Sequence, residues 1–240
     1  MGIMRETAFD NFRFSSGPSP LSEQPWAEVQ TEFDSLTRVF SCAELTVLFS
    51  EDQLPSSVFY LLEGQVKLSM NSSSGRRLIL GIAHPGDTLG LAATLSGDRY
   101  DKTAEALSPC KLASISRESF LDLLSRHPAA YKNVVRELCR DHARAHEQLR
   151  TFGLAATAPA KLARLLLEWG DHGRKTNEGT RFSCTFTHGE IGEFIGASRE
   201  TVTRIFSDFK CHDVLKSRGS TLIISDVKAL ELYAGVVKLD

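Results

Sequence analysis

Hydrophobic positions follow two different periods along the chain. Between about residues 40 and 115, short apolar runs such as Val58–Leu62, Val66–Met70 and Arg77–Gly81 are separated by Gly, Pro, Asn and Asp. That pattern predicts many short strands joined by tight turns. Strands of this number and spacing favour a closed β-roll or barrel. A short amphipathic helix is expected just before them, at residues 26–37.

From Ser116 onward the spacing becomes helical, with a short helix, a break at His127-Pro128 and then a long helix. Along the long helix, one row of residues alternates spacings of four and three, which is the a/d seam of a helix that packs against a second helix. The seam consists of Tyr131, Val135, Leu138, His142, Ala145, Leu149 and Phe152. We therefore predict a homodimer joined along this helix.

The stretch 187–209 contains two short helices joined by a tight turn at Gly196-Ala197. Thr187 stands three residues before Glu190, which is the capping-box spacing of a helix start. Ser198 is a good N-cap for the second helix. One face of this second helix is apolar. The other face carries Arg199, Glu200, Thr203 and Arg204.

A helix of this length fits the major groove of B-DNA, with its first residues at the base edges. Arginine can donate two hydrogen bonds to guanine, and glutamate can accept one from cytosine. Because a carboxylate repels phosphate, Glu200 is better suited to reading a base than to holding the backbone. The alternative interpretation is an ordinary helical hairpin with a solvated charged face.

The segment GASRETVTRIF closely resembles the recognition helix of the Crp/Fnr family of bacterial transcription regulators. The segments FYLLEGQVKLSM, GRRLIL and PGDTLG resemble the cyclic-nucleotide-binding fold of the same family, in the same order, so that the resemblance extends from about residue 30. It implies an α+β fold: an N-terminal cyclic-nucleotide-binding-type β-roll, a long central dimerisation helix and a C-terminal winged helix-turn-helix. It also implies that Arg199, Glu200 and Arg204 read bases in TGTGA-like half-sites of an inverted repeat. Thr187 and the helix starts, including Ser198, would hold phosphates.

On this basis the chain is divided into a mobile N-terminal tail (1–24), a sensor β-roll (25–127), a dimerisation helix with hinge (128–156) and a DNA-binding domain (157–240). Within the last of these, a hairpin wing is expected, with Arg218 at its tip near phosphate. Asp213 occupies a turn where the family commonly has glycine, and aspartate tolerates the left-handed conformation. Residues 170–180 are interpreted as a polar loop, which by family analogy lies near surfaces that touch RNA polymerase.

The expected effector pocket departs from the family pattern. Counting from Gly90, the family's ribose-binding glutamate falls on Leu91 and its phosphate-binding Arg-Ser pair on Asp101 and Lys102. A carboxylate at a buried phosphate site is unfavourable, because the two charges repel and neither is solvated. Arg99 or Lys102 could substitute in a shifted register. The sequence therefore does not favour cyclic nucleotide binding, and the roll could instead serve as a dimer platform or sense an unrelated ligand.

The chain of 240 residues has a formal net charge of −2, so any DNA affinity must come from the local placement of charge. Its five cysteines are widely spaced, without a CxxC pair. This pattern is typical of reduced thiols. The N-terminal region has no iron–sulfur motif, so we expect no such cluster. Cys139, His142 and His146 share a helix face, where a metal, haem or thiol switch is conceivable. A fourth ligand is not apparent, so no metal site is predicted.

The sequence has no nucleophile elbow, phosphate-binding glycine loop or metal-ligand spacing, so an enzyme is not expected. Without an apolar run of membrane-spanning length or a signal peptide, we expect a cytoplasmic protein that has no membrane partner. The leading prediction is a homodimeric regulator of double-stranded DNA, not controlled by cyclic AMP. The alternatives are a regulator gated by a cyclic nucleotide or another effector, including redox or haem signals, and a small-molecule module whose winged domain binds protein.

Overall fold

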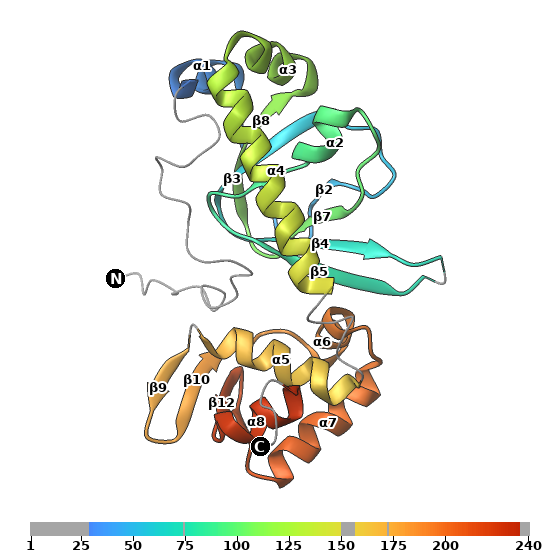
Figure 1. The fold of residues 1–240 in the computed structure, drawn as a ribbon, viewed down its shortest axis with the longest axis vertical. Helices are drawn as coiled ribbons and strands as arrows, with labels where there is room; N and C mark the ends of the chain where they lie inside the picture. Colours follow the sequence, from blue (N-terminus) through green and yellow to red (C-terminus); the bar gives the residue numbers. More distant parts are fainter. Residues whose placement is uncertain (1–28, 74, 150–156, 172, 236–240) are drawn as a thin grey trace. The chain divides into compact units, whose positions relative to one another are not determined.

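The computed structural model describes residues 29–73, 75–149, 157–171 and 173–235. The predicted tail, residues 26–28 of the first predicted helix and the seam residue Phe152 lie outside these ranges. The described residues form two compact units (Figure 1). The first is built from residues 29–71 and 79–145, and the second contains residues 157–235.

The first unit is a β-roll made of two four-stranded sheets. One has the strand order β1-β8-β3-β6 and the other the order β2-β7-β4-β5. Neighbours such as β1 and β8, or β4 and β7, pair in the antiparallel sense. The strands are β1 (Arg38–Cys42), β2 (Val47–Phe49), β3 (Ser57–Glu63), β4 (Val66–Asn71), β5 (Arg77–Ala83), β6 (Thr88–Leu89), β7 (Thr103–Ala106) and β8 (Cys110–Ser116). The β3–β4 hairpin and the third strand lie where the alternating pattern predicts them.

Aromatic rings fill much of the interior of the roll. Tyr100 is 1% exposed and stacks on Phe49 with ring centroids 4.0 Å apart. Phe49 in turn stacks on Phe59, and Phe40 meets Phe59 edge to face. The hydroxyl of Tyr100 donates a hydrogen bond of 2.8 Å to the carbonyl of Ser57. Each of these rings removes a large apolar area from water, so the stack contributes strongly to the stability of the roll.

Four helices accompany the roll: α1 (Gln30–Leu36), α2 (Leu91–Ser96), α3 (Arg117–Arg126) and α4 (Pro128–Gln148). The predicted break is confirmed, because His127 caps α3 and Pro128 begins α4. Proline is well suited to a first helical position, where its missing N–H is not needed. Val29 is the N-cap of α1.

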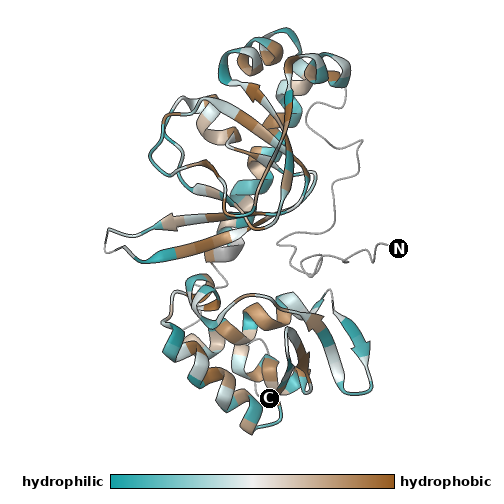
Figure 2. Cartoon of the chain, turned by 180° about the vertical axis from the view of Figure 1, so that it is seen from behind, coloured by the Kyte–Doolittle hydropathy of each residue, from teal (hydrophilic) through white to brown (hydrophobic). Residues whose placement is uncertain are grey.

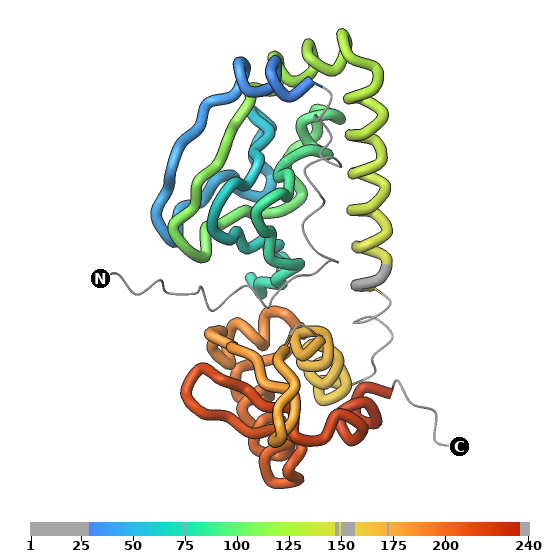
Figure 3. The backbone as a smooth tube through the Cα atoms, turned by 90° about the vertical axis from the view of Figure 1, so that its left-hand side faces the viewer, coloured from blue at the N-terminus to red at the C-terminus, as the bar shows by residue number. Residues whose placement is uncertain are grey.

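The long helix α4 runs beside the roll (Figure 3). It has two apolar sides. Ala130 and Val134 are buried in the core that α1, α3 and the first sheet share. Tyr131 and Val135 on the predicted seam are 52% and 41% exposed. Leu138 is half-buried and packs against the same core. It therefore belongs partly to the unit's own core rather than wholly to the predicted seam.

The second unit combines four helices with a sheet of strand order β11-β12-β10-β9. Its elements are α5 (Ala158–Asp171), β9 (Arg174–Thr176), β10 (Gly179–Ser183), α6 (His188–Ile195), α7 (Arg199–Cys211), β11 (Leu215–Arg218), β12 (Thr221–Ile224) and α8 (Val227–Ala234). Trp169, Phe186 and Phe194 form an aromatic cluster with centroid separations of 5.1–5.6 Å. This cluster joins α5 to the start of the helix-turn-helix.

The interpretation of residues 170–180 as a polar loop is wrong in part. Residues 174–176 form the edge strand β9, which pairs with β10 to make a polar hairpin (Figure 2). All three residues of β9 are exposed, so no apolar alternation reveals this strand in the sequence. Its pairing is set by β10, which is itself held by β12.

The predicted α+β architecture is confirmed: a β-roll, a long helix and a helix-turn-helix with a small sheet. Across the part of the chain that the structure describes, no helix combines the length and the apolar character needed to cross a membrane.

Candidate nucleic-acid interface

The helix-turn-helix begins with the predicted capping box. The Thr187 side chain accepts from the backbone N–H of Glu190, and the Glu190 carboxylate accepts from the backbone N–H of Thr187 at 2.9 Å. The Thr187 hydroxyl also lies 2.9 Å from the same carboxylate, to which it donates. Because its proton is used in this way, Thr187 fixes the start of α6 and has no hydroxyl proton left for a phosphate.

The turn between the two helices depends on two glycines. Gly196 ends α6 in the left-handed conformation, with φ of 66°. Gly192 lies within α6, where a β-carbon would stand only 2.5 Å from the carbonyl oxygen of Ala197. The turn after α6 folds back so closely on the helix that only glycine fits at position 192, which the apolar pattern of the sequence does not reveal.

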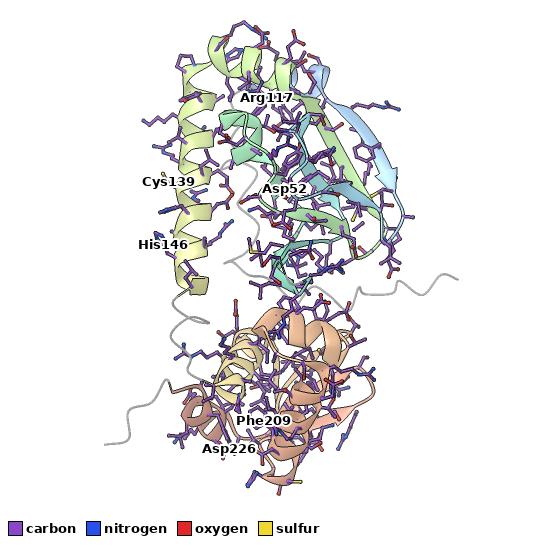
Figure 4. All side chains as sticks on the ribbon, turned by 90° about the vertical axis from the view of Figure 1, so that its right-hand side faces the viewer. Asp52, Arg117, Cys139, His146, Phe209 and Asp226 are labelled. Atoms are coloured by element: carbon purple, nitrogen blue, oxygen red, sulfur yellow. The ribbon has the colours of Figure 1, made fainter. Side chains whose placement is uncertain are left out.

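The second helix, α7, is oriented by its apolar face. Ser198 caps it by accepting from the backbone N–H of Thr201 at 3.2 Å. Phe209, labelled in Figure 4, is completely buried in the second unit. The buried residues on this face are Val202, Ile205, Phe206 and Phe209. They leave the opposite face of the helix to solvent.

Arg199, Glu200 and Arg204 are exposed on that opposite face. Among the described residues, neither arginine forms an ion pair. The pKa of Glu200 lies below its usual value, first because the carboxylate accepts from its own backbone N–H and then because of the Ser198 hydroxyl and Arg199. Glu200 is therefore an ionised acceptor at neutral pH, which is the state that a contact with a base donor requires.

Thr203 differs from the other residues predicted on this face. Its hydroxyl donates to the carbonyl of Arg199 at 2.9 Å and lies 2.8 Å from Nδ1 of His188. Since the hydroxyl proton is already used, Nδ1 must carry the hydrogen of that second bond. The ring of His188 also stacks on Phe206, with centroids 4.7 Å apart. Thr203 therefore links α7 to α6.

His188 is the residue of this site that sequence reasoning missed. Burial lowers its pKa, and the positive charges of Lys210 and Arg199 lower it further. Its partners, Thr203 and Phe206, lie on α7, and α7 contacts α6 only after folding. A lone histidine at a helix start carries no signal of that contact.

In the wing, Arg218 ends β11 and forms an ion pair of 2.9 Å with Glu178 in the β9–β10 turn. Both side chains are largely exposed, so the pair is weak and can open toward phosphate. Asp213 has φ of 55°, which confirms the expected left-handed turn.

The residues at the expected effector pocket serve the fold. Leu91 begins α2 and is buried in the core shared with α3 and α4. Gly90 has φ of 78°, and a β-carbon there would lie 2.8 Å from the ring of Tyr100. On the count from Gly90, Leu91 is the residue expected at the family's acidic position, and its side chain faces hydrocarbon.

The neighbouring charges are engaged with protein groups. The Arg99 guanidinium donates to the carbonyl of Asp52 at 2.5 Å. Lys102 lies 3.4 Å from the carboxylate of Asp101. The substitution of Arg99 or Lys102 for the family's phosphate-binding arginine would have to displace these contacts.

Cys139, His142 and His146 lie on α4, where Figure 4 labels the first and last of them. Within the described residues, no group of three side chains has the arrangement needed to hold a metal ion.

The fold and the exposed face of α7 define a class of protein: a DNA-binding regulator with a cyclic-nucleotide-type β-roll. Residues 40–127 match the model of the cyclic nucleotide-binding domain, and residues 160–233 match that of the Crp-like helix-turn-helix domain. The chain belongs to the Crp/Fnr family of transcription regulators and, as a member of that family, is not an enzyme.

Individual relatives agree with this assignment. The transcriptional activatory protein AadR of Rhodopseudomonas palustris is 30% identical over 204 residues, which make up 85% of this chain and 84% of that protein. A CRP-like cAMP-activated global transcriptional regulator of Mycobacterium tuberculosis is 24% identical and covers 76% of this chain and 82% of its own length. The structure of CLP from Xanthomonas campestris, a c-di-GMP responsive global regulator, has a TM-score of 0.74 at 18% identity, with 83% and 99% coverage.

Proposed function

We propose that this DNA-binding regulator acts as a homodimer on an inverted repeat with TGTGA-like half-sites, and that cyclic AMP does not control it. The observation that carries the proposal is the face of α7 on which Arg199, Glu200 and Arg204 are exposed while the apolar face is buried. The two arginines supply bidentate donors and Glu200 supplies an acceptor for cytosine. The helix starts hold phosphates, at Ser198 through the backbone because the hydroxyl is engaged by Glu200, and Arg218 joins them when its ion pair with Glu178 opens.

The exposed seam of α4 supports the homodimer. Tyr131, Val135 and Leu149 are large apolar side chains left in solvent, and Leu149 is 67% exposed. A second copy of the same helix would cover them by coiled-coil packing. Two copies also place two recognition helices on the half-sites of a palindrome. Val135→Asp is expected to give a monomer in analytical ultracentrifugation while leaving the helix content unchanged.

Three features support a regulator that is independent of cyclic AMP. Leu91 is part of the core, Arg99 is bound to a backbone carbonyl and the interior of the roll holds a stack of aromatic rings. The relatives respond to different effectors by their own descriptions, one to cAMP and another to c-di-GMP. The competing candidate is a regulator that needs some other effector before it binds DNA.

RNA polymerase, by family analogy, is the partner of the polar β9–β10 hairpin region.

The deciding experiment is fluorescence anisotropy of the purified protein without added effector. A duplex with the TGTGA inverted repeat and a scrambled duplex are titrated at two salt concentrations. We expect tight binding to the repeat, weak binding to the scrambled duplex and a steep loss of affinity with salt. Equal weak binding to both duplexes would contradict an effector-independent regulator of this half-site.

A further inference from the structure

Cys42 and Cys110 face each other across the first sheet of the β-roll. Cys42 is the last residue of β1, Cys110 is the first of β8, and the antiparallel register pairs the two directly. Directly opposed residues of neighbouring strands point to the same face of the sheet. Both side chains pack in one core cluster, where Cys110 is buried and Cys42 is half-buried.

This placement is close to the geometry of a disulfide. Opposed residues of antiparallel strands have Cα atoms about 4.5 or 5.5 Å apart, and disulfides bridge Cα separations of about 4.4–6.8 Å. Their Cβ atoms are about 4.5–5.5 Å apart, whereas a disulfide needs about 3.5–4.5 Å. An approach of about 1 Å therefore suffices. The pair lies at the end of the β1–β8 ladder.

We propose that Cys42 and Cys110 form an intramolecular disulfide when the protein meets a hydroperoxide. The half-buried Cys42 sulfur attacks the peroxide, the O–O bond breaks, and a sulfenic acid and one water form. The Cys110 sulfur then attacks the sulfenyl sulfur. The S–O bond breaks, and the departing hydroxide takes the Cys110 proton as a second water. Two thiols lose two electrons in total, and one hydrogen peroxide is reduced to two waters.

The surroundings of Cys110 assign the two roles. Burial raises the pKa of its thiol, and the neighbouring Cys42 adds to the rise, so Cys110 is poorly suited to meet the oxidant first. Its Sγ lies 3.2 Å from the carbonyl oxygens of Gln65 and Ser108. Forming the disulfide releases only this weak thiol donor, because the Gln65 carbonyl keeps the Leu107 N–H at 2.8 Å.

The other three cysteines provide internal controls. Cys139 and Cys211 are exposed on separate helices, and Cys184 is buried in the second unit. None of them stands opposite another cysteine in the strand pairings of the described residues. A full-length variant with Cys139→Ser, Cys184→Ala and Cys211→Ser therefore isolates the pair.

The test exposes the wild-type chain and this triple variant to a small excess of hydrogen peroxide. The samples are then denatured, alkylated with N-ethylmaleimide and mapped as peptides without reductant. We expect the loss of both free thiols and a Cys42–Cys110 peptide pair lighter by two hydrogens, which dithiothreitol separates. In Cys42→Ser, Cys110 should stay alkylatable, and in Cys110→Ser, Cys42 should proceed to sulfinic acid.

Two outcomes would overturn the proposal. One is recovery of Cys42 and Cys110 as maleimide adducts at peroxide doses that oxidise Cys139 and Cys211 in the wild type. The other is Cys42 sulfinic acid beside an alkylated Cys110 in the wild type. The wild-type chain is mapped in parallel, so the test gives an answer even if the triple variant fails to fold. The readout needs no DNA and is independent of the proposed half-site.

Discussion

The two regions where the family binds its ligands differ in what surrounds their charged side chains. On α7, Arg199 and Arg204 are exposed and form no ion pair with any described residue. Around α2, Arg99 is bound to a backbone carbonyl and Lys102 to a carboxylate, while Leu91 is sealed in the core. The arginines of α7 contact no acidic group of the described chain, whereas Arg99 and Lys102 already contact groups of their own unit.

The two regions should therefore respond differently to substitution. A hydrated side chain outside the core can be removed with little effect on stability, so its loss should be detected only when DNA is present. A side chain that has become part of the core should show the opposite response, in stability and not in binding. Substitutions at Leu91, Arg199, Glu200 and Thr187, together with one ligand, test this contrast.

The largest effect is expected at Leu91. Replacing it with Ala should lower the free energy of unfolding by about 2–5 kcal/mol, because a cavity opens in a packed core. Leu91→Glu, which restores the family's acidic residue, should cost more because it buries an unpaired carboxylate. Urea unfolding followed by circular dichroism measures both changes.

Ala92 provides the matched control, because it is the exposed neighbour of Leu91 on α2. Ala92→Glu should leave the unfolding midpoint nearly unchanged. A stable Leu91→Glu protein that gains affinity for cyclic AMP would contradict the assignment of Leu91 to the core alone. The region would then be a ligand site that lacks one residue.

A smaller effect is expected for Arg199→Ala on the other side of the comparison. Affinity for the TGTGA repeat should fall by about 1–3 kcal/mol, because one bidentate base contact is lost. Affinity for the scrambled duplex and the unfolding free energy should stay close to wild type. A loss of equal size on both duplexes would mean that Arg199 holds phosphate rather than a base.

For Glu200→Ala, the expected result is a relaxed preference at one base pair of the half-site, with binding retained. The carboxylate repels phosphate, so its removal should not weaken binding to the scrambled duplex. Competition titrations with duplexes substituted at each position of the half-site measure this. An equal loss of affinity for every duplex would show that Glu200 does not read a base.

Features that depend on residues close together in the chain can be predicted from the sequence. The capping box at Thr187, the αL turn at Asp213 and the stop at His127-Pro128 rest on contacts within a few residues, and all three were predicted. Such local rules need no knowledge of the tertiary fold.

The missed features depend on which other element a residue meets after folding, and the pattern within one element does not carry that information. His188 meets Thr203 and Phe206 only when α6 packs on α7. The edge strand β9 has no apolar residue and takes its pairing from β10. Leu138 was assigned wholly to the seam because periodicity places a residue on a helix face without saying which core that face meets.

Thr187→Ala should have a moderate effect that separates the two roles considered for this residue. Loss of the N-cap should lower stability by about 0.5–2 kcal/mol, and Thr187→Ser should restore most of it. Affinity for DNA should change little once both proteins are fully folded. A Thr187→Ala protein with wild-type stability but much weaker binding to every duplex would instead assign Thr187 to a phosphate.

The smallest effect is expected from cyclic AMP itself. A ligand that binds the folded state raises the unfolding temperature by mass action, and the positions that would hold the ribose and phosphate are occupied by the Leu91 side chain and by Asp101. We therefore expect no change in the melting temperature of the wild-type protein with cyclic AMP in large excess, and no change in DNA affinity by anisotropy. A shift that grows with cyclic AMP concentration and disappears in Arg99→Ala would show that the guanidinium leaves the Asp52 carbonyl for phosphate. In that case the contacts around α2 would describe only the ligand-free state of a functional pocket. The two regions would then differ in whether the ligand is bound, and not in the chemistry of their side chains.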